Sequence, residues 1–164
     1  MKSAPRQNVN RLDAIEILKD DHEQVRALFR SYENLILGTN VVEKEELVSL
    51  VSNELIIHTL LEEEIFYHAA RSVMQVHYLL DEAEFEHSSM TEIIGQLREL
   101  SPVDAVYDSK VLLLRDYVYH HVMKEEDKIF PKMQRAHVDL LALGDQLIQR
   151  RRELIMEAEL GESL

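Results

Sequence analysis

Histidine and glutamate lie four residues apart at two places in this sequence. His58 precedes Glu62 in HTLLE, and His121 precedes Glu125 in HVMKE. Four residues are about one turn of an α-helix, or roughly 6 Å along its axis, so each pair would offer a nitrogen and an oxygen ligand on one side of a helix. Such donors suit a metal ion. The composition alone would give about one such pair, so the interpretation depends on where the pairs lie.

Two further histidines stand where a helix should face a hydrophobic core. His22 lies four residues after Leu18 and three before Val25, and His87 lies four residues after Ala83. One inward histidine is usually a hydrogen-bonded core residue. Six inward ionisable groups are different, because each would cost on the order of several kcal/mol without a partner. We predict that two cations, held by imidazoles and bridged by carboxylates, compensate these groups, which are His22, His58, Glu62, His87, His121 and Glu125.

The order of the six residues also repeats along the chain. The first and second histidines are 36 residues apart, the third and fourth are 34 residues apart, and a glutamate follows each second histidine. This repeat predicts two related helical hairpins. Packed antiparallel about a pseudo-two-fold axis, each hairpin would contribute two imidazoles and one carboxylate to a site at the middle of a bundle.

Helices are the elements that would position these residues. The chain has only 4 Gly and 3 Pro, and its apolar residues recur at helical spacing in five segments. Gly38 should end the first helix, Ser101 and Pro102 should begin the fourth, and Pro131 should break or kink the chain after it. The expected helices cover about residues 13–37, 42–71, 76–100, 102–130 and 132–159. Short connections between them predict an all-α, up-down-up-down four-helix bundle with an additional C-terminal helix.

We expect a single domain, because 164 residues with 46% apolar content can build one core. The bundle would cover residues 13–131. Residues 132–160 would form an accessory helix in the same domain, either packed outside the bundle or used in association. Its basic cluster, Arg150, Arg151 and Arg152, is expected to be a solvated helix face.

Composition excludes several classes of function. The absence of Cys removes disulfides, thiolate ligands and cysteine nucleophiles, and leaves nitrogen and oxygen donors. A net charge of −13 opposes binding to nucleic acid, and no apolar run approaches the roughly 20 residues of a membrane span. The polar N-terminal segment does not resemble a secretion signal. We therefore expect a cytoplasmic protein that binds neither nucleic acid nor membrane.

Taken in order, the segments LKDDHEQVRALF, HTLLEEEIFY, FEHSSM and HHVMKEEDKIFP resemble the hemerythrin-like, or HHE cation-binding, domains. That family consists of four-helix bundles with a non-heme di-iron centre. The resemblance implies two iron ions, with the four histidines as terminal ligands, Glu62 and Glu125 as bridges, and an oxo or hydroxo group between the irons. Zinc or manganese could occupy the same donors.

The sequence departs from the oxygen-carrying members of the family at one ligand position. These members have a further histidine one turn before His87, where this chain has Ala83. The more symmetric set is similar to the centres of iron-sulfur repair proteins and iron sensors in the family. The departure argues against reversible oxygen carriage.

The resemblance implies a di-iron protein that binds or reduces a small oxidant, namely oxygen, peroxide or nitric oxide. Turnover of a peroxidase, catalase or nitric oxide-related kind stays open. The alternative is an iron or oxygen sensor that signals through a partner protein, with the C-terminal helix as the surface for that partner or for a homodimer. A third alternative, a structural bundle without metal, requires the six groups to find partners among themselves.

Other polar residues near the motifs are expected to have lesser roles. We expect His120 to lie in a second shell or on the surface, and His68, His77 and His137 to be exposed. The carboxylates next to the predicted bridges, Glu63, Glu64 and Glu126, are expected to be solvated. Tyr32, Tyr117 and Tyr119 are expected to serve packing.

Overall fold

The structure, a computed structural model, describes residues 11–75 and 77–161 and is helical, with no strand among these residues. Its elements are α1 (Ala14–Leu35), α2 (Val41–Leu61), η1 (Glu62–Phe66), α3 (Tyr67–Val73), α4 (Tyr78–Arg98), α5 (Tyr107–Lys124), η2 (Glu125–Ile129), α6 (Phe130–Arg135) and α7 (Leu140–Glu159). The elements η1 and η2 are single turns of π-helix. The predicted all-α class is confirmed.

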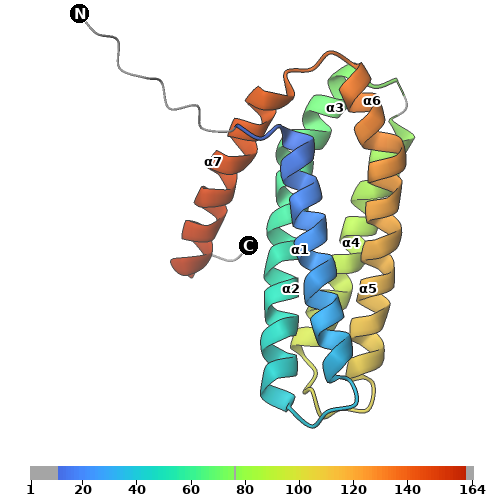
Figure 1. Ribbon diagram of the computed structural model, residues 1–164, viewed down its shortest axis with the longest axis vertical. Helices are drawn as coiled ribbons and strands as arrows, with labels where there is room; N and C mark the ends of the chain where they lie inside the picture. The colour runs from blue at the N-terminus through green and yellow to red at the C-terminus, as the bar shows by residue number, and fades with distance from the viewer. Residues whose placement is uncertain (1–10, 76, 162–164) are drawn as a thin grey trace, which may run out of the picture.

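Four long rods run alongside one another and alternate in direction (Figure 1). The first hairpin pairs α1 with α2, and the second pairs α4 with α5. The π turn η1 and helix α3 continue α2, whereas η2 and α6 continue α5. Helix α7 lies outside the four rods and packs against α1 and α2. The up-down-up-down bundle with an additional C-terminal helix is therefore as predicted.

Side chains at the N-terminal ends fix where several helices begin. Asp13 accepts a hydrogen bond from the backbone of Glu16, whose side chain accepts one from the backbone of Asp13, so the two form a capping box for α1. Asn40 caps α2 and Asp139 caps α7 more simply, because each side chain accepts one hydrogen bond from a backbone N–H in the first turn of its helix. Each cap satisfies an N–H group that the helix itself leaves without an acceptor.

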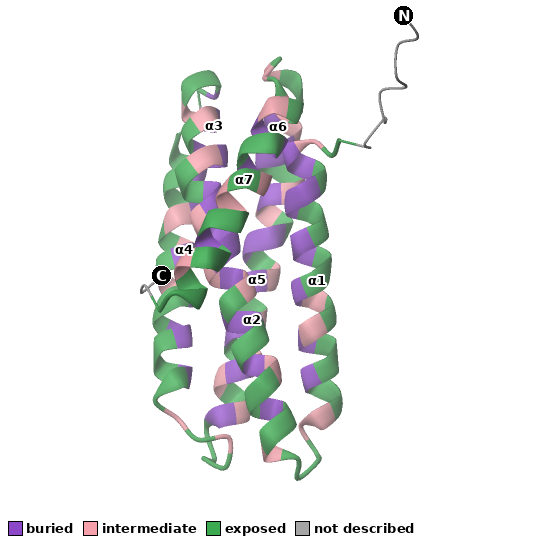
Figure 2. Cartoon of the chain, turned by 90° about the vertical axis from the view of Figure 1, so that its left-hand side faces the viewer, coloured by how far each residue is buried: buried purple, intermediate pink, exposed green. Residues whose placement is uncertain are grey.

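The core consists of two clusters of buried side chains, one toward each end of the bundle (Figure 2). One cluster includes Phe66 and Phe130, together with Leu147 from α7. The other includes Phe29 and Tyr32. The predicted ligand residues lie between the two clusters, so hydrophobic side chains hold the helices together on both sides of them. None of the described helices has the length and hydropathy that a membrane-spanning segment requires.

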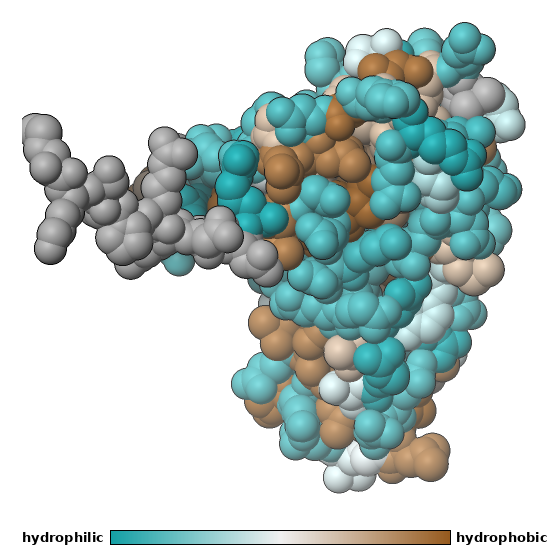
Figure 3. Space-filling view, turned by 45° about the horizontal axis from the view of Figure 1, so that its top comes forward, coloured by the Kyte–Doolittle hydropathy of each residue, from teal (hydrophilic) through white to brown (hydrophobic). Residues whose placement is uncertain are grey.

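In an oblique view with the end that carries α3 and α6 brought forward, the surface is mostly hydrophilic, with one group of hydrophobic residues in the upper part and others scattered toward the lower end (Figure 3). Helix α7 approaches the start of α1 closely, because residue 144 is a glycine. A Cβ atom there would lie 2.5 Å from the carbonyl oxygen of Leu12. Arg11 also forms an ion pair with Asp145 of α7. The C-terminal helix is thus held against the bundle by backbone contact as well as by side chains.

The predicted start of the fourth helix was wrong. Residues 101–106 form turns, and α5 begins only at Tyr107. The backbone N–H of Ser101 donates to the Asp104 carboxylate at 2.7 Å, and the Asp104 N–H donates to the Ser101 carbonyl at 2.9 Å. Ser101 and Asp104 therefore close a turn on each other, and Ser101 does not cap a helix that starts at Pro102.

Pro131, predicted to break or kink the chain, does not break it. The chain stays helical as far as Arg135, and the break comes at residues 136–139, where His137 has a φ of 57°. The π turn η2 precedes the proline and changes the hydrogen-bond ladder, so Pro131 falls in the first turn of α6, where no N–H donor is needed.

Candidate metal centre

Side chains from all four rods converge between the two core clusters. The six predicted residues are each at most 4% exposed, and the two glutamates are fully buried. His58 Nε2 lies 3.2 Å from Glu62 Oε1, and His22 Nε2 lies 3.3 Å from Glu125 Oε2. In the other hairpin, His87 Nε2 lies 3.2 Å from Glu62 Oε2, and His121 Nε2 lies 3.4 Å from Glu125 Oε2. Each glutamate therefore faces a histidine of both hairpins.

The donor atoms fall into two groups that share Glu62. In each group the candidate donor atoms lie within 4.8 Å of one another, as ligands of one ion would. The first group offers four donors and the second offers three; they are His22, His58, Glu62 and Glu125, and Glu62, His87 and His121. Nitrogen and oxygen donors in such sets suit divalent transition metals.

Four buried polar atoms at the centre lack a hydrogen bond. These atoms are His22 Nε2, His58 Nε2, Glu62 Oε1 and Glu125 Oε2. His22 Nε2 lies near Glu125 Oε2, and His58 Nε2 lies near Glu62 Oε1, but neither pair has the geometry of a hydrogen bond. Buried polar groups are normally hydrogen-bonded, and leaving one unpaired costs about 1–3 kcal/mol. Atoms that instead aim at a common point fit cation ligands, so the residues present fit a metal centre.

The outer nitrogen of each histidine is held by a carboxylate. The four contacts, each between Nδ1 and a carboxylate oxygen, are His22 with Glu126 at 2.9 Å, His58 with Asp21 at 3.1 Å, His87 with Glu63 at 2.8 Å and His121 with Glu86 at 3.0 Å. Such contacts orient the ring and direct Nε2 inward, as is usual for metal-ligating histidines. All four imidazoles are therefore positioned with Nε2 toward the same centre.

Of the neighbouring carboxylates predicted to be solvated, Glu63 and Glu64 are exposed and Glu126 is half-buried, but all three also make specific contacts. Glu63 and Glu126 directly follow the two predicted bridges and hold histidines of the opposite hairpin. Glu64 pairs with Arg150 of α7. The sequence did carry a signal, because an acid directly precedes His22 and His87 and directly follows Glu62 and Glu125. Helical periodicity alone did not show that these acids reach across to another rod.

The basic cluster of α7 is not simply a solvated face. Arg151 forms an ion pair with Asp21, the partner of His58, and lies 4.0 Å from Glu54. Arg150 pairs with Glu64 at 2.7 Å. Of the three arginines, Arg152 alone matches the expectation, since it is exposed. The sequence could not indicate these contacts, because they depend on which face of the bundle α7 covers.

Tyr67 is a member of the site that sequence reasoning missed. Its side chain is fully buried, and its hydroxyl donates to Glu125 Oε1 at 2.5 Å and to Glu62 Oε2 at 3.4 Å. Its ring stacks on the His87 imidazole, with centroids 5.5 Å apart. In a regular α-helix, five residues would leave Tyr67 about 140° away from Glu62. The π turn η1 takes up one extra residue and brings both side chains to the same face.

The charges of the centre reinforce one another. Burial alone would lower the pKa of His121, but the nearby Glu125, Glu62 and Glu86 outweigh it and raise the pKa to about 10. Burial would raise the pKa of Glu62, but the surrounding histidines hold it well below its usual value. The pKa values of the three other ligand histidines are raised by the same kind of carboxylate contacts. Without metal, the charged forms of these histidines and of Glu62 are therefore favoured, although His87 Nε2 and His121 Nε2, 3.0 Å apart, have room for one proton between them.

A small apolar cavity adjoins three of the histidines. Its volume is about 10 Å³, roughly the space of one water molecule. His22, His58 and His121 line one side of it. Apolar side chains from all four rods make up most of the rest, namely Val25, Leu55, Met90, Val118 and Val122. The cavity offers room for a small ligand beside the centre.

A wider groove of about 460 Å³ reaches the centre from outside, between α2 and α4. His87 and Glu63 lie along it, as does Thr91. On the opposite hairpin, Arg26 stands four residues after His22 and lies 3.4 Å from Glu126. The corresponding position after His87 is Thr91, and among the described residues Glu63 pairs with no lysine or arginine. The Glu63 carboxylate, 40% exposed, is therefore the least enclosed of the four that hold histidines.

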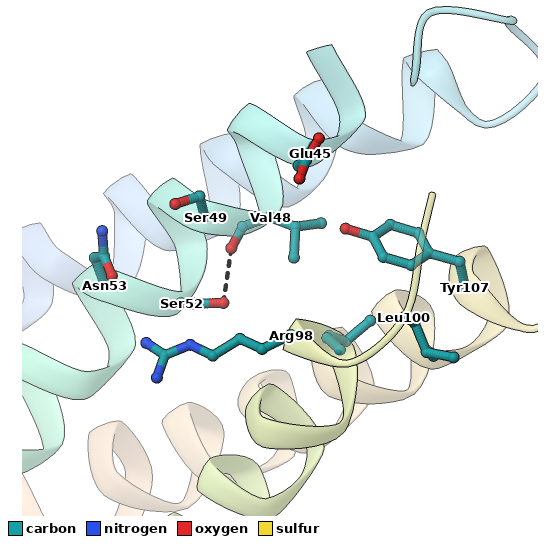
Figure 4. Close-up of a pocket in the computed structure, with 9 residues that line it drawn as sticks. Glu45, Val48, Ser49, Ser52, Asn53, Arg98, Leu100 and Tyr107 are labelled. Atoms are coloured by element: carbon teal, nitrogen blue, oxygen red, sulfur yellow. Dashed lines mark hydrogen bonds between the residues drawn. The ribbon is translucent and has the colours of Figure 1, made fainter. Parts of the chain in front are cut away.

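Other polar features lie away from the centre. A pocket of about 240 Å³ lies near the end of the bundle that is away from α3 and α6. It is lined by Glu45, Arg98 and Tyr107, among others, and none of the predicted ligand histidines lines it (Figure 4). His120 is 69% exposed, with Glu86 3.7 Å away, so it belongs to the surface. His68, His77 and His137 are exposed as predicted.

Comparisons with known proteins agree with this geometry. A family model for the hemerythrin HHE cation-binding domain matches residues 13–133. The chain therefore belongs to the hemerythrin HHE cation-binding family. In fold, it is similar to a hemerythrin HHE cation-binding domain-containing protein from Mycobacterium kansasii, a homologue of Rv2633c, with a TM-score of 0.77 and 19% identity over 93% of this chain and 95% of the other.

A curated relative matches part of the chain. It is a DNA nickase from Nostoc sp., 28% identical over 116 residues. The match covers 70% of this chain but only 32% of the nickase. The chain thus corresponds to about a third of that relative's length.

Proposed function

We propose that this protein is a non-heme di-iron protein that binds or reduces a small oxidant: oxygen, peroxide or nitric oxide. His22 and His58 would hold one iron, and His87 and His121 would hold the other. Glu62 and Glu125 would bridge the pair. The observation that supports this best is the set of buried donor atoms without hydrogen bonds, aimed at one centre by histidines whose outer nitrogens are all held.

When bound, an iron pair supplies electrons to an oxidant and accepts them back. The chain contributes the surroundings. Tyr67 keeps an O–H group 2.5 Å from Glu125 Oε1, so a proton is held beside the bridging carboxylates. The small apolar cavity excludes bulk water and bulky molecules, which favours diatomic ligands and peroxide.

Metal analysis tests this proposal. Purified protein should contain two irons per chain and show near-ultraviolet absorption from oxygen ligands on ferric iron. It should then consume hydrogen peroxide, two molecules of which give one of oxygen and two of water without an added reductant. A protein that takes up no iron when Fe²⁺ is supplied without oxygen would overturn the proposal.

Single substitutions test which residues hold iron. His58→Ala and His121→Ala should each lower the iron content by about one ion per chain, because each removes one imidazole from a different donor group. His120→Ala, on an exposed neighbour of His121, is the matched control and should keep both ions. Equal iron loss in all three variants would contradict the assignment.

A sensor remains the second candidate function, and one observation favours it. Arg151 of α7 contacts the acid that holds His58, so the C-terminal helix is joined to the centre. A sensor would consume peroxide slowly or not at all, and would lose much helix when the iron is chelated. Fast peroxide consumption with helix content unchanged by chelation would favour redox chemistry instead.

A further inference from the structure

The carboxylates that hold the histidines follow the pseudo-two-fold repeat. Asp21 directly precedes His22 and holds His58, and Glu86 directly precedes His87 and holds His121. These two acids therefore occupy equivalent positions in the two hairpins. Within residues 11–75 and 77–161, each is the only carboxylate on the outer nitrogen of its histidine, so its placement sets the direction in which that ring points.

The two equivalent acids form ion pairs with basic side chains from different parts of the fold. Glu86 pairs with Lys124 at 2.8 Å, and Lys124 directly precedes Glu125 in the same hairpin. The equivalent residue before Glu62 is Leu61, which is fully buried and carries no charge. The first hairpin therefore has no lysine at the position that supports the acid in the second.

In the first hairpin, Arg151 of α7 supplies the positive charge that pairs with the acid. Its guanidinium pairs with Asp21 Oδ2, the same oxygen that accepts from His58 Nδ1. The Arg151 side chain is only 23% exposed and the Asp21 side chain 11%, so the pair is largely shielded from solvent. The cation comes from outside the four rods, on a helix whose Gly144 brings it close to the start of α1.

We propose that Arg151 is a positioning residue for the metal centre: it fixes Asp21, and thereby His58, so that docking of α7 controls how firmly the His22–His58 half retains its metal. Lys124 has the equivalent role for the His87–His121 half. This inference rests on the proposed metal binding. Docking of α7 would then slow the release of metal from one of the two positions.

Metal release tests the inference without measuring activity. The full chain is loaded with two equivalents of Fe²⁺ under anaerobic conditions and mixed with an excess of a chromophoric Fe²⁺ chelator. In Arg151→Gln, about half of the iron should leave about 10-fold faster than from the wild type, as expected for loss of an outer contact to one ligand. In Lys124→Gln, the other half should leave faster. His58→Ala and His121→Ala, each missing one ion, identify the halves.

Arg150→Gln is the matched control. Arg150 is also an α7 arginine in a partly buried ion pair, 25% exposed, but its partner Glu64 holds no histidine. This variant should release both irons at nearly the wild-type rate. Arg151→Lys should restore most of the retention, because it keeps a cation beside Asp21. Thermal unfolding of the metal-free variants, compared between Arg150→Gln and Arg151→Gln, measures the loss of α7 docking common to both.

Each other outcome has a definite meaning. Equal release rates in Arg151→Gln and Arg150→Gln would overturn the inference, as would acceleration of both halves together by Arg151→Gln. If Arg151→Gln fails to fold, Asp21→Asn should still accelerate the same half, and its failure to do so would also overturn the inference. A wild-type chain that binds no Fe²⁺ would instead overturn the proposed function.

Discussion

Two buried tyrosines make the same contact in different surroundings. Tyr67 donates to Glu125 and Tyr32 donates to Asp108, each at 2.5 Å. Tyr67 lies at the metal centre. Tyr32 lies in the other core cluster, where Lys44 also binds Asp108 at 2.9 Å. Comparing the two tyrosines therefore distinguishes the contribution of a hydroxyl group to folding from its contribution to the candidate metal centre.

Replacing each tyrosine by phenylalanine should give different results with and without metal. Without metal, Tyr67→Phe should lower the free energy of unfolding by about 1.5–3 kcal/mol, the typical value of a hydrogen bond to a charged group. With metal bound, the loss should be smaller, because the ion also satisfies Glu125. Tyr32→Phe is the control, and its cost should be the same in both states. Chemical denaturation with and without a chelator measures all four values, and equal costs for Tyr67→Phe would contradict this role.

The raised histidine pKa values predict how stability depends on pH. The pKa of His121, about 10 in the folded, metal-free chain, exceeds its unfolded value of about 6.5. Its protonation therefore stabilises the fold fully below pH of about 6.5, and this stabilisation is lost as the pH rises toward about 10. The denaturation midpoint of metal-free protein should fall over this range.

Metal should remove that dependence, because bound imidazoles carry no proton at the ligating nitrogen. Loaded protein should keep a nearly constant midpoint over the same range. Adding Fe²⁺ to metal-free protein near pH 7 should release protons, which a pH indicator in weakly buffered solution detects. A midpoint that rises with pH in the metal-free chain would contradict the electrostatic account.

At the residue scale, the sequence could predict six inward side chains from periodicity, and the structure brings these six together. Their role as ligands remains a prediction. Sequence reasoning could not find Tyr67, because its position depends on a π turn that regular periodicity does not contain. It also missed Glu63 and Glu126, because their partners belong to other rods.

Each π turn begins at one of the two glutamates predicted to bridge the metal ions. The extra residue of a π turn is accommodated locally, so the helix that follows keeps nearly the register it would have after an α turn. This explains why Tyr67, five residues after Glu62, occupies the position that the fourth residue after Glu62 would have in a regular α-helix. The turns adjust where the carboxylates point without rotating α3 or α6 away from the core.

Single-residue deletions test this local accommodation. Deleting Glu64 from η1 should convert the π turn to an α turn and keep the far-ultraviolet helix signal and cooperative unfolding. Deleting Asn53, an exposed residue in the regular part of α2, should rotate the following residues by about 100° and disrupt folding. Arg150→Gln corrects for the ion pair lost with Glu64. Equal disruption by both deletions would mean that η1 is not a local insertion.

At the scale of elements, hydrophobic periodicity located the five helical segments but not all of their ends. The start of α5 was misplaced because Ser101 and Asp104 bind each other across a turn. Pro131 did not break the chain because η2 comes before it. Both errors arose where short-range hydrogen bonds, which periodicity does not report, decide the backbone path.

At the scale of the whole molecule, the repeat of histidine spacings correctly indicated two related hairpins around one centre. The hairpins are alike in their predicted ligands and in the acids that contact these residues, but they differ in their surroundings. The first is covered by α7, which does not pack on the second to the same extent, and the groove that reaches His87 lies between the two. The sequence could predict an extra helix but not the face it covers, because that depends on close contacts such as the one at Gly144.

The size of the cavity beside the histidines implies a steric threshold for any molecule that enters it. A space of about 10 Å³ accepts a molecule of one or two heavy atoms, and anything larger must displace a wall. The β-branched wall residues Val25, Val118 and Val122 are stiff, whereas the unbranched side chain of Met90 can change rotamer with little strain. For the oxidants proposed above, a change of the Met90 rotamer would be the least costly way to enlarge this space.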